Sequence, residues 1–211
     1  MSGRFITVEG IEGVGKSTQV TRLASLLEKR GIPHLVTREP GGTPLAERIR
    51  EIVLTTREEA LPATAELLLM FAARAVHLAN KIEPALSKGS WVICDRFTDA
   101  TYAYQGAGRG MDLEAISMLE KLVQGTRRPD LTLLLDAPVE QALERADKRR
   151  GNEQKDRFEH ERVEFFARVR EGYRARARLE PGRFALIDAT LPMDEVTERL
   201  TAAIEERGWI T

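Results

Sequence analysis

Cysteine is almost absent from this chain, which limits where the protein can work. Cys94 is the only cysteine among the 211 residues, so no disulfide can form within the chain. Residues 1–5 contain no apolar stretch of the kind that a secretory signal requires. No apolar run reaches the roughly 18 residues that a membrane-spanning helix needs. We therefore expect a cytoplasmic protein without a membrane partner.

An excess of charge of one sign is also missing. Lys and Arg together number 32 and Asp and Glu number 33, which leaves a formal net charge of -1. Proteins that bind nucleic acid usually carry a basic excess, so we expect no nucleic-acid partner. Apolar content of 42% and charged content of 31% are ordinary for a folded globular chain. The length suits a single domain over residues 1–211 with a substantial core.

Short apolar runs alternate with longer helical patterns along the chain. The runs predict five buried strands, at residues 5–8, 34–37, 91–94, 131–135 and 184–187. Helical periodicity predicts helices at 17–30, 44–55, 62–88, 113–123, from 139, and 192–207. This alternation favours a three-layer α/β fold in which helices flank a five-stranded parallel sheet. Ligands of such sheets bind where the strands end, so functional residues should follow the strands.

Residues 144–162 interrupt this pattern because most of them are charged. A run of this kind is usually a solvated surface, here two helices with a turn at Gly151-Asn152. The alternative is a short mobile lid whose arginines close over an anion. The segment by itself does not decide between these two interpretations.

The strongest motif follows the first predicted strand and opens the first helix. It reads Gly10-Ile11-Glu12-Gly13-Val14-Gly15-Lys16-Ser17 and continues with Thr18, which matches the phosphate-binding loop G-x-x-x-x-G-K-[ST]. Glycines allow backbone N–H groups to turn inward around an anion, and the helix N-terminus adds positive charge. Lys16 supplies a charge for the β- and γ-phosphates, and the Ser17 hydroxyl suits Mg²⁺. We therefore expect all nine residues to bind ATP in a fold of the P-loop NTPase type.

Other sequence features narrow the reaction. Asp95 ends the third predicted strand, where its carboxylate can support Mg²⁺ through water beside Ser17. Arg96 follows directly, which indicates either a second phosphate or an ion pair at the end of the strand. A guanine-reading motif is missing, because the near match at Asn80 lies within a helical pattern. A GTPase switch is therefore disfavoured.

A second group of polar side chains should meet at the same edge of the sheet. Arg38 and Glu39 follow the second strand, and Arg96 follows the third. Arg74 stands in an otherwise apolar helical stretch, where it is either paired within the protein or free to contact a ligand through its planar fork. The sequence leaves both options open.

Four motifs, together with Glu12, resemble the bacterial thymidylate kinase family. They are Thr37-Arg38-Glu39-Pro40-Gly41-Gly42-Thr43, Phe71-Ala72-Ala73-Arg74, Asp95-Arg96-Phe97 and Ala103-Tyr104-Gln105-Gly106. The similarity extends from about residue 4 to residue 200. The phosphate loop is common to many families, whereas the other four motifs in this order are specific. The resemblance implies transfer of a phosphoryl group from ATP to dTMP, with Mg²⁺, in a homodimer.

The resemblance also implies roles for individual residues. In the family pattern, Glu12 meets the sugar 3′-hydroxyl of dTMP, and Arg38 and Arg96 hold its phosphate. Arg96 also lies near the transferred phosphoryl group. Arg74 bonds to O4 of thymine.

Further along the chain, Thr101 and Gln105 match residues that contact the edge of the base. Tyr104 matches the residue that crowds the sugar 2′ position and selects deoxyribose. The chain departs from the family at the thymine-stacking position, where Met70 replaces the usual aromatic residue. Either the Met70 thioether takes over this contact, or Phe71 does.

Catalysis requires more positive charge than the phosphate loop supplies. Lys16 is the only cation in the loop, so the resemblance implies that lid arginines complete the site. Arg149, Arg150 and Arg157 are candidates, and we favour Arg150 and Arg157 as catalytic residues beside Lys16 and Arg96. The turn at 188–190 is equally consistent with an adenine contact or a simple strand-to-helix connection.

Two competing functions remain at this stage. The first is a kinase for another small acceptor such as dUMP or a nucleoside, although two arginines suit an acceptor that already carries phosphate. The second is an ATPase switch driven by a partner protein. The apolar helical stretch at 65–86 is either the dimer interface or part of the core.

Overall fold

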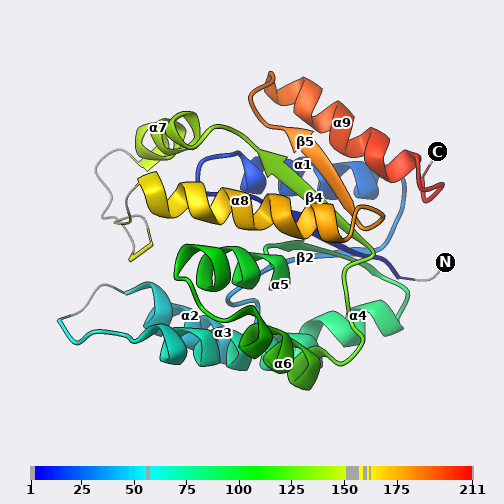
Figure 1. Cartoon of the computed structure of the whole chain (residues 1–211). Coiled ribbons are helices and arrows are strands. Elements are labelled where there is room, and N and C mark those ends of the chain that lie inside the picture. The colour runs from blue at the N-terminus through cyan, green and yellow to red at the C-terminus, as the bar shows by residue number, and fades with distance from the viewer. Residues whose placement is uncertain (1–2, 56–57, 151–156, 159–160, 162, 211) are drawn as a thin grey trace.

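Five parallel strands form the centre of the computed structural model, which describes residues 3–55, 58–150, 157–158, 161 and 163–210. The strands are β1 (Phe5–Glu9), β2 (His34–Arg38), β3 (Trp91–Asp95), β4 (Leu131–Asp136) and β5 (Phe184–Asp188). Their order in the sheet is β2-β3-β1-β4-β5 (Figure 1). The predicted five-stranded parallel sheet is confirmed, and each strand is one residue longer than its prediction.

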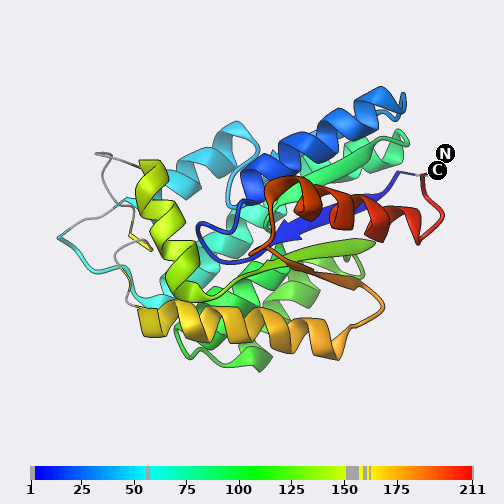
Figure 2. The ribbon, with the colours of Figure 1, turned by 90° about the horizontal axis from the view of Figure 1, so that it is seen from above.

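Helices cover both faces of the sheet (Figures 1 and 2). Helices α1 (Lys16–Lys29) and α9 (Met193–Glu205) pack together on one face. The other face carries α8 (Val163–Leu179), α5 (Thr98–Thr101), the π-helical η2 (Tyr102–Gly108) and α6 (Leu113–Gln124). Helices α2 (Pro44–Leu54) and α3 (Ala63–His77) pack against each other below them in Figure 1. The prediction of three layers is confirmed.

The helix predicted at 62–88 is nearly continuous but changes form near its end. Helix α3 passes into a π-helical turn, η1 (Leu78–Ile82), and then into α4 (Glu83–Ser87). Pro84 explains the change, because proline has no N–H and its ring clashes with the carbonyl four residues earlier, so the helix widens there. Asn80 lies in this turn, away from any strand end, as the sequence indicated.

Helix α7 (Val139–Arg150) follows β4 and lies against the loop between β1 and α1 (Figure 2). The first part of the predicted lid, residues 144–150, completes this helix. Residues 151–156, 159, 160 and 162 of the predicted lid lie outside the described residues, as does the side chain of Arg150.

The core lies between the sheet and both helical layers. Strands β1, β3 and β4 are buried almost throughout, which agrees with their continuous apolar character. Helix α8 adds Phe165, Phe166 and Tyr173 to this core, although no helix was predicted at 163–179. None of the helices in the described ranges is long and apolar enough to cross a membrane.

Candidate active site

The phosphate loop joins the end of β1 to the start of α1, at the carboxyl edge of the sheet. Two of its glycines leave no room for a side chain. A Cβ on Gly10 would stand 2.4 Å from the Leu135 carbonyl oxygen, and one on Gly13 would stand 1.8 Å from that of Ala142. Gly13 also has a φ of 80°, which favours glycine. Close contact with β4 and α7 therefore requires glycine at both positions.

Lys16 and Ser17 begin helix α1 inside this loop. Lys16 is buried, and its Nζ donates a 2.8 Å hydrogen bond to the Ile11 carbonyl. Burial, with Arg96 nearby, lowers the pKa of Lys16 to about 8. The Ser17 hydroxyl donates to Asp95 Oδ2 at 3.4 Å, while Asp95 Oδ1 is buried without a hydrogen-bond partner among the described residues. One hydroxyl and one carboxylate with spare capacity fit Mg²⁺, which takes its remaining ligands from phosphate and water.

Arg96 follows β3 and turns back toward the phosphate loop. Its φ of 68° is unusual for a residue with a side chain, which indicates that its surroundings hold it there. Its Nη1 donates to the Gly10 carbonyl at 2.8 Å and to the Tyr173 hydroxyl at 3.0 Å. Its guanidinium lies 4.8 Å from the centre of the Tyr104 ring, and its Nη2 lies 3.6 Å from Glu12 Oε2. Arg96 is thus directed into the site rather than paired with its neighbour Asp95.

Glu12 connects the phosphate loop to helix α7. Its Oε1 lies 2.8 Å from Nη2 of Arg149, and Arg149 lines the same phosphate pocket as Lys16. Burial acts to raise the pKa of Glu12, but Lys16, Arg96 and Arg149 outweigh it and lower the pKa to about 2. Glu12 is therefore a carboxylate at neutral pH and can accept a hydrogen bond from a hydroxyl.

A buried carboxyl group that the sequence analysis missed lies behind Arg96. Glu9 ends β1 and is fully buried. It accepts hydrogen bonds from the Phe97 backbone N–H at 2.6 Å and from the Tyr173 hydroxyl at 2.9 Å. Burial, with Asp99 nearby, raises the pKa of Glu9 to about 8. Glu9 thereby holds the backbone directly after Arg96 and the Tyr173 hydroxyl to which the Arg96 side chain donates.

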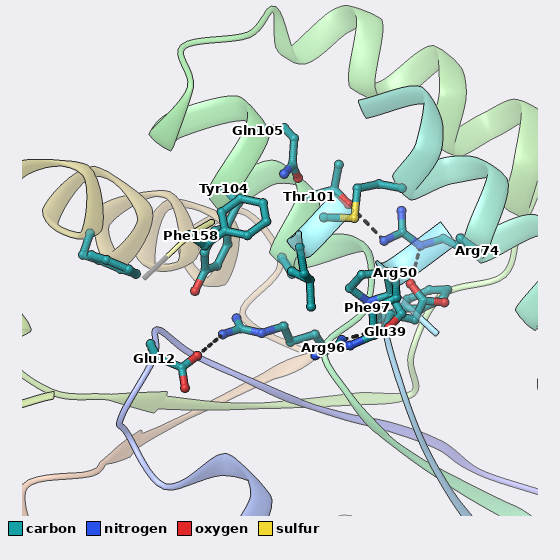
Figure 3. A pocket seen from close by; sticks show the side chains of 15 residues that line it. Glu12, Glu39, Arg50, Arg74, Arg96, Phe97, Thr101, Tyr104, Gln105 and Phe158 are labelled. Atoms are coloured by element: carbon teal, nitrogen blue, oxygen red, sulfur yellow. Dashed lines mark hydrogen bonds and ion pairs between the residues drawn. The ribbon is translucent and has the colours of Figure 1, made fainter. Parts of the chain in front are cut away.

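Beside the phosphate loop lies a second cavity (Figure 3). Its walls come from the phosphate loop, the segments after β2 and β3, helices α2, α3, α5, η2 and α8, and the segment before α8. The lining residues are Glu12, Glu39, Pro40, Arg50, Leu54, Met70, Arg74, Arg96, Phe97, Ala100, Thr101, Tyr104, Gln105, Phe158 and Phe166. Seven residues that were predicted to bind dTMP line this cavity together, namely Glu12, Met70, Arg74, Arg96, Thr101, Tyr104 and Gln105.

Arg74 is both paired and open to a ligand. Its Nε donates to Glu39 at 2.7 Å and its Nη2 donates to Thr101 at 2.9 Å. Its Nη1 is buried without a hydrogen-bond partner among the described residues. Leaving a buried donor unpaired is unfavourable, so this N–H group fits an acceptor supplied by a bound molecule.

Met70, and not Phe71, faces the cavity. Phe71 is directed the other way and is buried with Leu67, Tyr102 and Ile116. Its ring also supports Arg74, whose guanidinium lies 4.9 Å from the ring centre. Successive helical residues point in directions about 100° apart, which lets Met70 line the cavity while Phe71 is buried in the core. The family's stacking position is therefore occupied here by a thioether.

Arg157 lies elsewhere than its predicted place beside the phosphates. Its guanidinium forms an ion pair with the buried Glu66 of α3, and it also donates to the Leu61 carbonyl. Arg150 and Arg157 were expected to act from the lid. Among the described side chains of the three candidates, that of Arg149 contacts the phosphate loop, through Glu12. The opposite charge of a fully buried carboxylate explains why Arg157 is held at α3. Arg150 lies outside the described side chains.

Phe158 is a cavity residue that the sequence analysis did not identify. Its ring meets Tyr104 edge to face, with 5.6 Å between ring centres (Figure 3). It follows a charged run, so no helical or strand period marked it as buried.

Two further predicted positions lie at other strand ends. Arg38, at the end of β2, lines the phosphate pocket and forms an ion pair with Glu47 at 3.0 Å. At the turn after β5, the Thr190 N–H and hydroxyl both donate to Asp188, at 2.9 and 2.6 Å. This local bonding fits the simple strand-to-helix connection.

The chain is similar to known proteins over almost its whole length. A family model described as thymidylate kinase matches residues 8–200. A thymidylate kinase of Teredinibacter turnerae is 58% identical over 205 residues, which covers 97% of this chain and 98% of the relative. One of Chromohalobacter salexigens is 59% identical over 206 residues, with 97% and 96% covered. The crystal structure of thymidylate kinase from Ehrlichia chaffeensis has a TM-score of 0.77 and 34% identity, and the match covers 97% of this chain and 99% of that one.

Proposed function

This chain belongs to the thymidylate kinase family and phosphorylates dTMP to dTDP with ATP, and we propose that the cavity beside β3 holds dTMP while the phosphate loop holds ATP. The two sites are adjacent, and Glu12 and Arg96 line both. This arrangement suits direct in-line transfer between two bound nucleotides, without a phosphorylated enzyme.

The observation that carries this assignment is the unpaired Nη1 of Arg74. Arg74 lines the cavity, and its Nη1 is a buried donor without a hydrogen-bond partner among the described residues. A pyrimidine carbonyl such as O4 of thymine would satisfy it. Thr101, already bonded to Arg74, and Gln105 lie beside it along the base edge. Met70 then supplies a soft surface against the base face.

At the other end of the cavity, the acceptor phosphate would lie near Arg38 and Arg96. Both line the phosphate pocket with Lys16. Glu12, with its lowered pKa, is suited to accept from the sugar 3′-hydroxyl. Tyr104 borders the same region and would crowd a 2′-hydroxyl. The charge for the transition state comes from Lys16, Arg96 and Arg149, and an arginine in this role contributes several orders of magnitude in rate.

Mg²⁺ is the divalent ion that we assign to this site. Ser17 and Asp95 would hold it, the latter through water, and the ion would neutralise charge on the ATP phosphates. Gly10, Ile11, Glu12, Gly13, Val14, Gly15 and Thr18 complete the ATP loop. We assign the protein to the cytoplasm, where a reducing environment keeps the buried free thiol of Cys94 intact.

We also propose a homodimer joined through α3 and α6. These two helices pack together and expose several large apolar side chains, namely Leu68, Leu113, Met118 and Leu122. Exposed apolar side chains gathered on neighbouring helices typify an interface. Light scattering of the wild type and of Met118→Glu/Leu122→Glu tests this, because the dimer should dissociate to monomers in the variant. A monomeric wild type would contradict it.

Calorimetric titration of dTMP tests the assignment of the cavity. Arg74→Ala should weaken dTMP binding at least about tenfold, because an acceptor on the base loses its buried partner. Arg178→Ala, an exposed arginine on α8, is the matched control and should bind dTMP normally. Equal dTMP affinity of Arg74→Ala and the wild type would contradict the assignment of the base to this cavity.

A further inference from the structure

A fully buried carboxylate outside the substrate cavity connects three separate parts of the protein. Glu66 of α3 accepts a 2.8 Å hydrogen bond at Oε1 from Nε2 of Gln105. Its Oε2 forms an ion pair with Arg157 and lies 3.5 Å from Nη2 of Arg109. Glu66 does not line the cavity, whereas its partner Gln105 does.

This bonding fixes which end of the Gln105 amide faces the cavity. A carboxylate paired with two arginines can only accept hydrogen bonds, so the NH₂ group of Gln105 must be the end that meets Glu66. The amide oxygen of Gln105, which lines the cavity, is thereby left for a bound molecule. Without Glu66, the amide could rotate by 180° and present its NH₂ group instead, since the two ends have nearly the same shape.

The base would then meet one hydrogen-bond donor and one hydrogen-bond acceptor, each at a fixed position. Arg74 Nη1 supplies the donor, and the Gln105 carbonyl supplies the acceptor. Thymine carries the complementary pair, with O4 as an acceptor and N3–H as a donor. Cytosine carries the reverse pair, an N4 amino donor and an unprotonated N3 acceptor. Both contacts would therefore fail for cytosine.

We propose that Glu66 is a positioning residue that sets base specificity, by locking the Gln105 amide so that its oxygen faces the base. This inference rests on the proposed placement of dTMP in the cavity. Glu66 acts through Gln105 and touches no substrate atom. Its second oxygen holds Arg157, whose neighbour Phe158 forms a wall of the same cavity.

The test compares kcat/KM for dTMP, dCMP and dUMP in the wild type and in Glu66→Gln. A glutamine at 66 can donate to the Gln105 oxygen and so permits the rotated amide. We expect the preference for dTMP over dCMP to fall by about tenfold or more, since hydrogen-bonding sites discriminate strongly. The preference for dTMP over dUMP should not change, because uracil has the same O4 and N3–H and lacks only the methyl group.

A reciprocal exchange supplies the rescue. In the double variant Glu66→Gln/Gln105→Glu, the carboxylate at 105 can only accept, so an acceptor again faces N3–H. The dTMP preference over dCMP should return toward the wild-type value. This variant also keeps the test open if Glu66→Gln fails to fold, because the exchange retains one carboxylate and one amide in contact.

Glu120→Gln is the matched control, since Glu120 is a buried carboxylate of α6 that bonds to Tyr102 and Arg128 away from the cavity. It should leave the ratio unchanged. The proposal is overturned if Glu66→Gln lowers kcat/KM for dTMP and dCMP equally, or if the double variant does not recover the ratio. Failure of the wild type to prefer dTMP over dCMP would instead count against the placement of the base.

Discussion

Nε of Arg74 lies 2.7 Å from Oε2 of Glu39, in a buried ion pair that ties helix α3 to the loop after β2. The other oxygen of Glu39 meets Nδ1 of His77 at 2.9 Å, and His77 in turn meets the Thr37 hydroxyl at 2.7 Å. The guanidinium that would read the base is thus held from behind by a chain of polar groups. We therefore expect dTMP binding to depend on how Glu39 orients the Arg74 guanidinium.

A substitution of Glu39 should therefore raise the KM for dTMP more than the KM for ATP. Glu39→Gln keeps the shape but removes the charge that holds Arg74, so we expect KM for dTMP to rise about tenfold. KM for ATP should stay within about twofold, and steady-state kinetics with each substrate varied in turn measure both. An equal rise in both constants would show that Glu39 supports the fold in general instead of positioning Arg74.

Arg149 and its neighbour Lys148 offer a matched pair on helix α7. Arg149 meets Glu12 at the phosphate loop, whereas Lys148 is exposed and pairs with Glu144. Arg149→Ala should lower kcat by about 10²-fold or more, because positive charge beside the transferred group is lost. Lys148→Ala removes the same charge one residue away and should retain kcat. Similar kcat values for the two variants would exclude Arg149 from catalysis.

Substitution of Met70 should weaken dTMP binding, whereas substitution of Phe71 should lower the stability of the fold. Met70→Ala removes a cavity wall, so KM for dTMP should rise several-fold with little change in the melting temperature. Phe71→Ala leaves a hole in the core and should lower the free energy of unfolding by about 3–5 kcal/mol. Kinetics and urea unfolding of both variants check this. The reverse outcome would place Phe71, not Met70, against the base.

Glu9 should make stability depend on pH. Its pKa is about 8 in the folded protein, against 4.5 for an ordinary glutamate, so the folded state retains a proton that the unfolded state releases. The free energy of unfolding should therefore fall as the pH rises from about 4.5 to about 8, by up to about 1.4 kcal/mol per pH unit. Glu9→Gln cannot release this proton, so its stability relative to the wild type should increase across that range. Urea unfolding at several pH values tests this, and parallel profiles would contradict it.

Much of the fold could be predicted because its signals are local. Strands such as Leu131–Asp136 are continuous apolar runs, and Gly10 to Ser17 is a contiguous motif between a strand and a helix. The rule that ligands bind at strand ends correctly brought Arg38, Glu39 and Arg96 to one edge of the sheet. Residues that belong to a motif and follow a strand were therefore found.

The missed features depend on contacts between distant parts of the chain. Nothing near Glu9 or Glu66 in the sequence shows that these carboxylates are buried, since their partners Tyr173 and Arg157 lie 164 and 91 residues away. Arg157 was assigned to the phosphates because charge alone does not reveal which opposite charge holds it. Phe158 has no periodic neighbours, so its place in the cavity follows only from the folded structure.

Coupled ADP production with ATP and Mg²⁺ tests the central claim most directly, with dTMP, dUMP, dCMP and thymidine as acceptors. The wild type should turn over dTMP far faster than dCMP or thymidine, and Arg74→Ala should lose most of this preference. Slow ATP hydrolysis that no acceptor stimulates would contradict the account. So would full activity on dTMP in Arg74→Ala, because the buried donor would then have no part in reading the base.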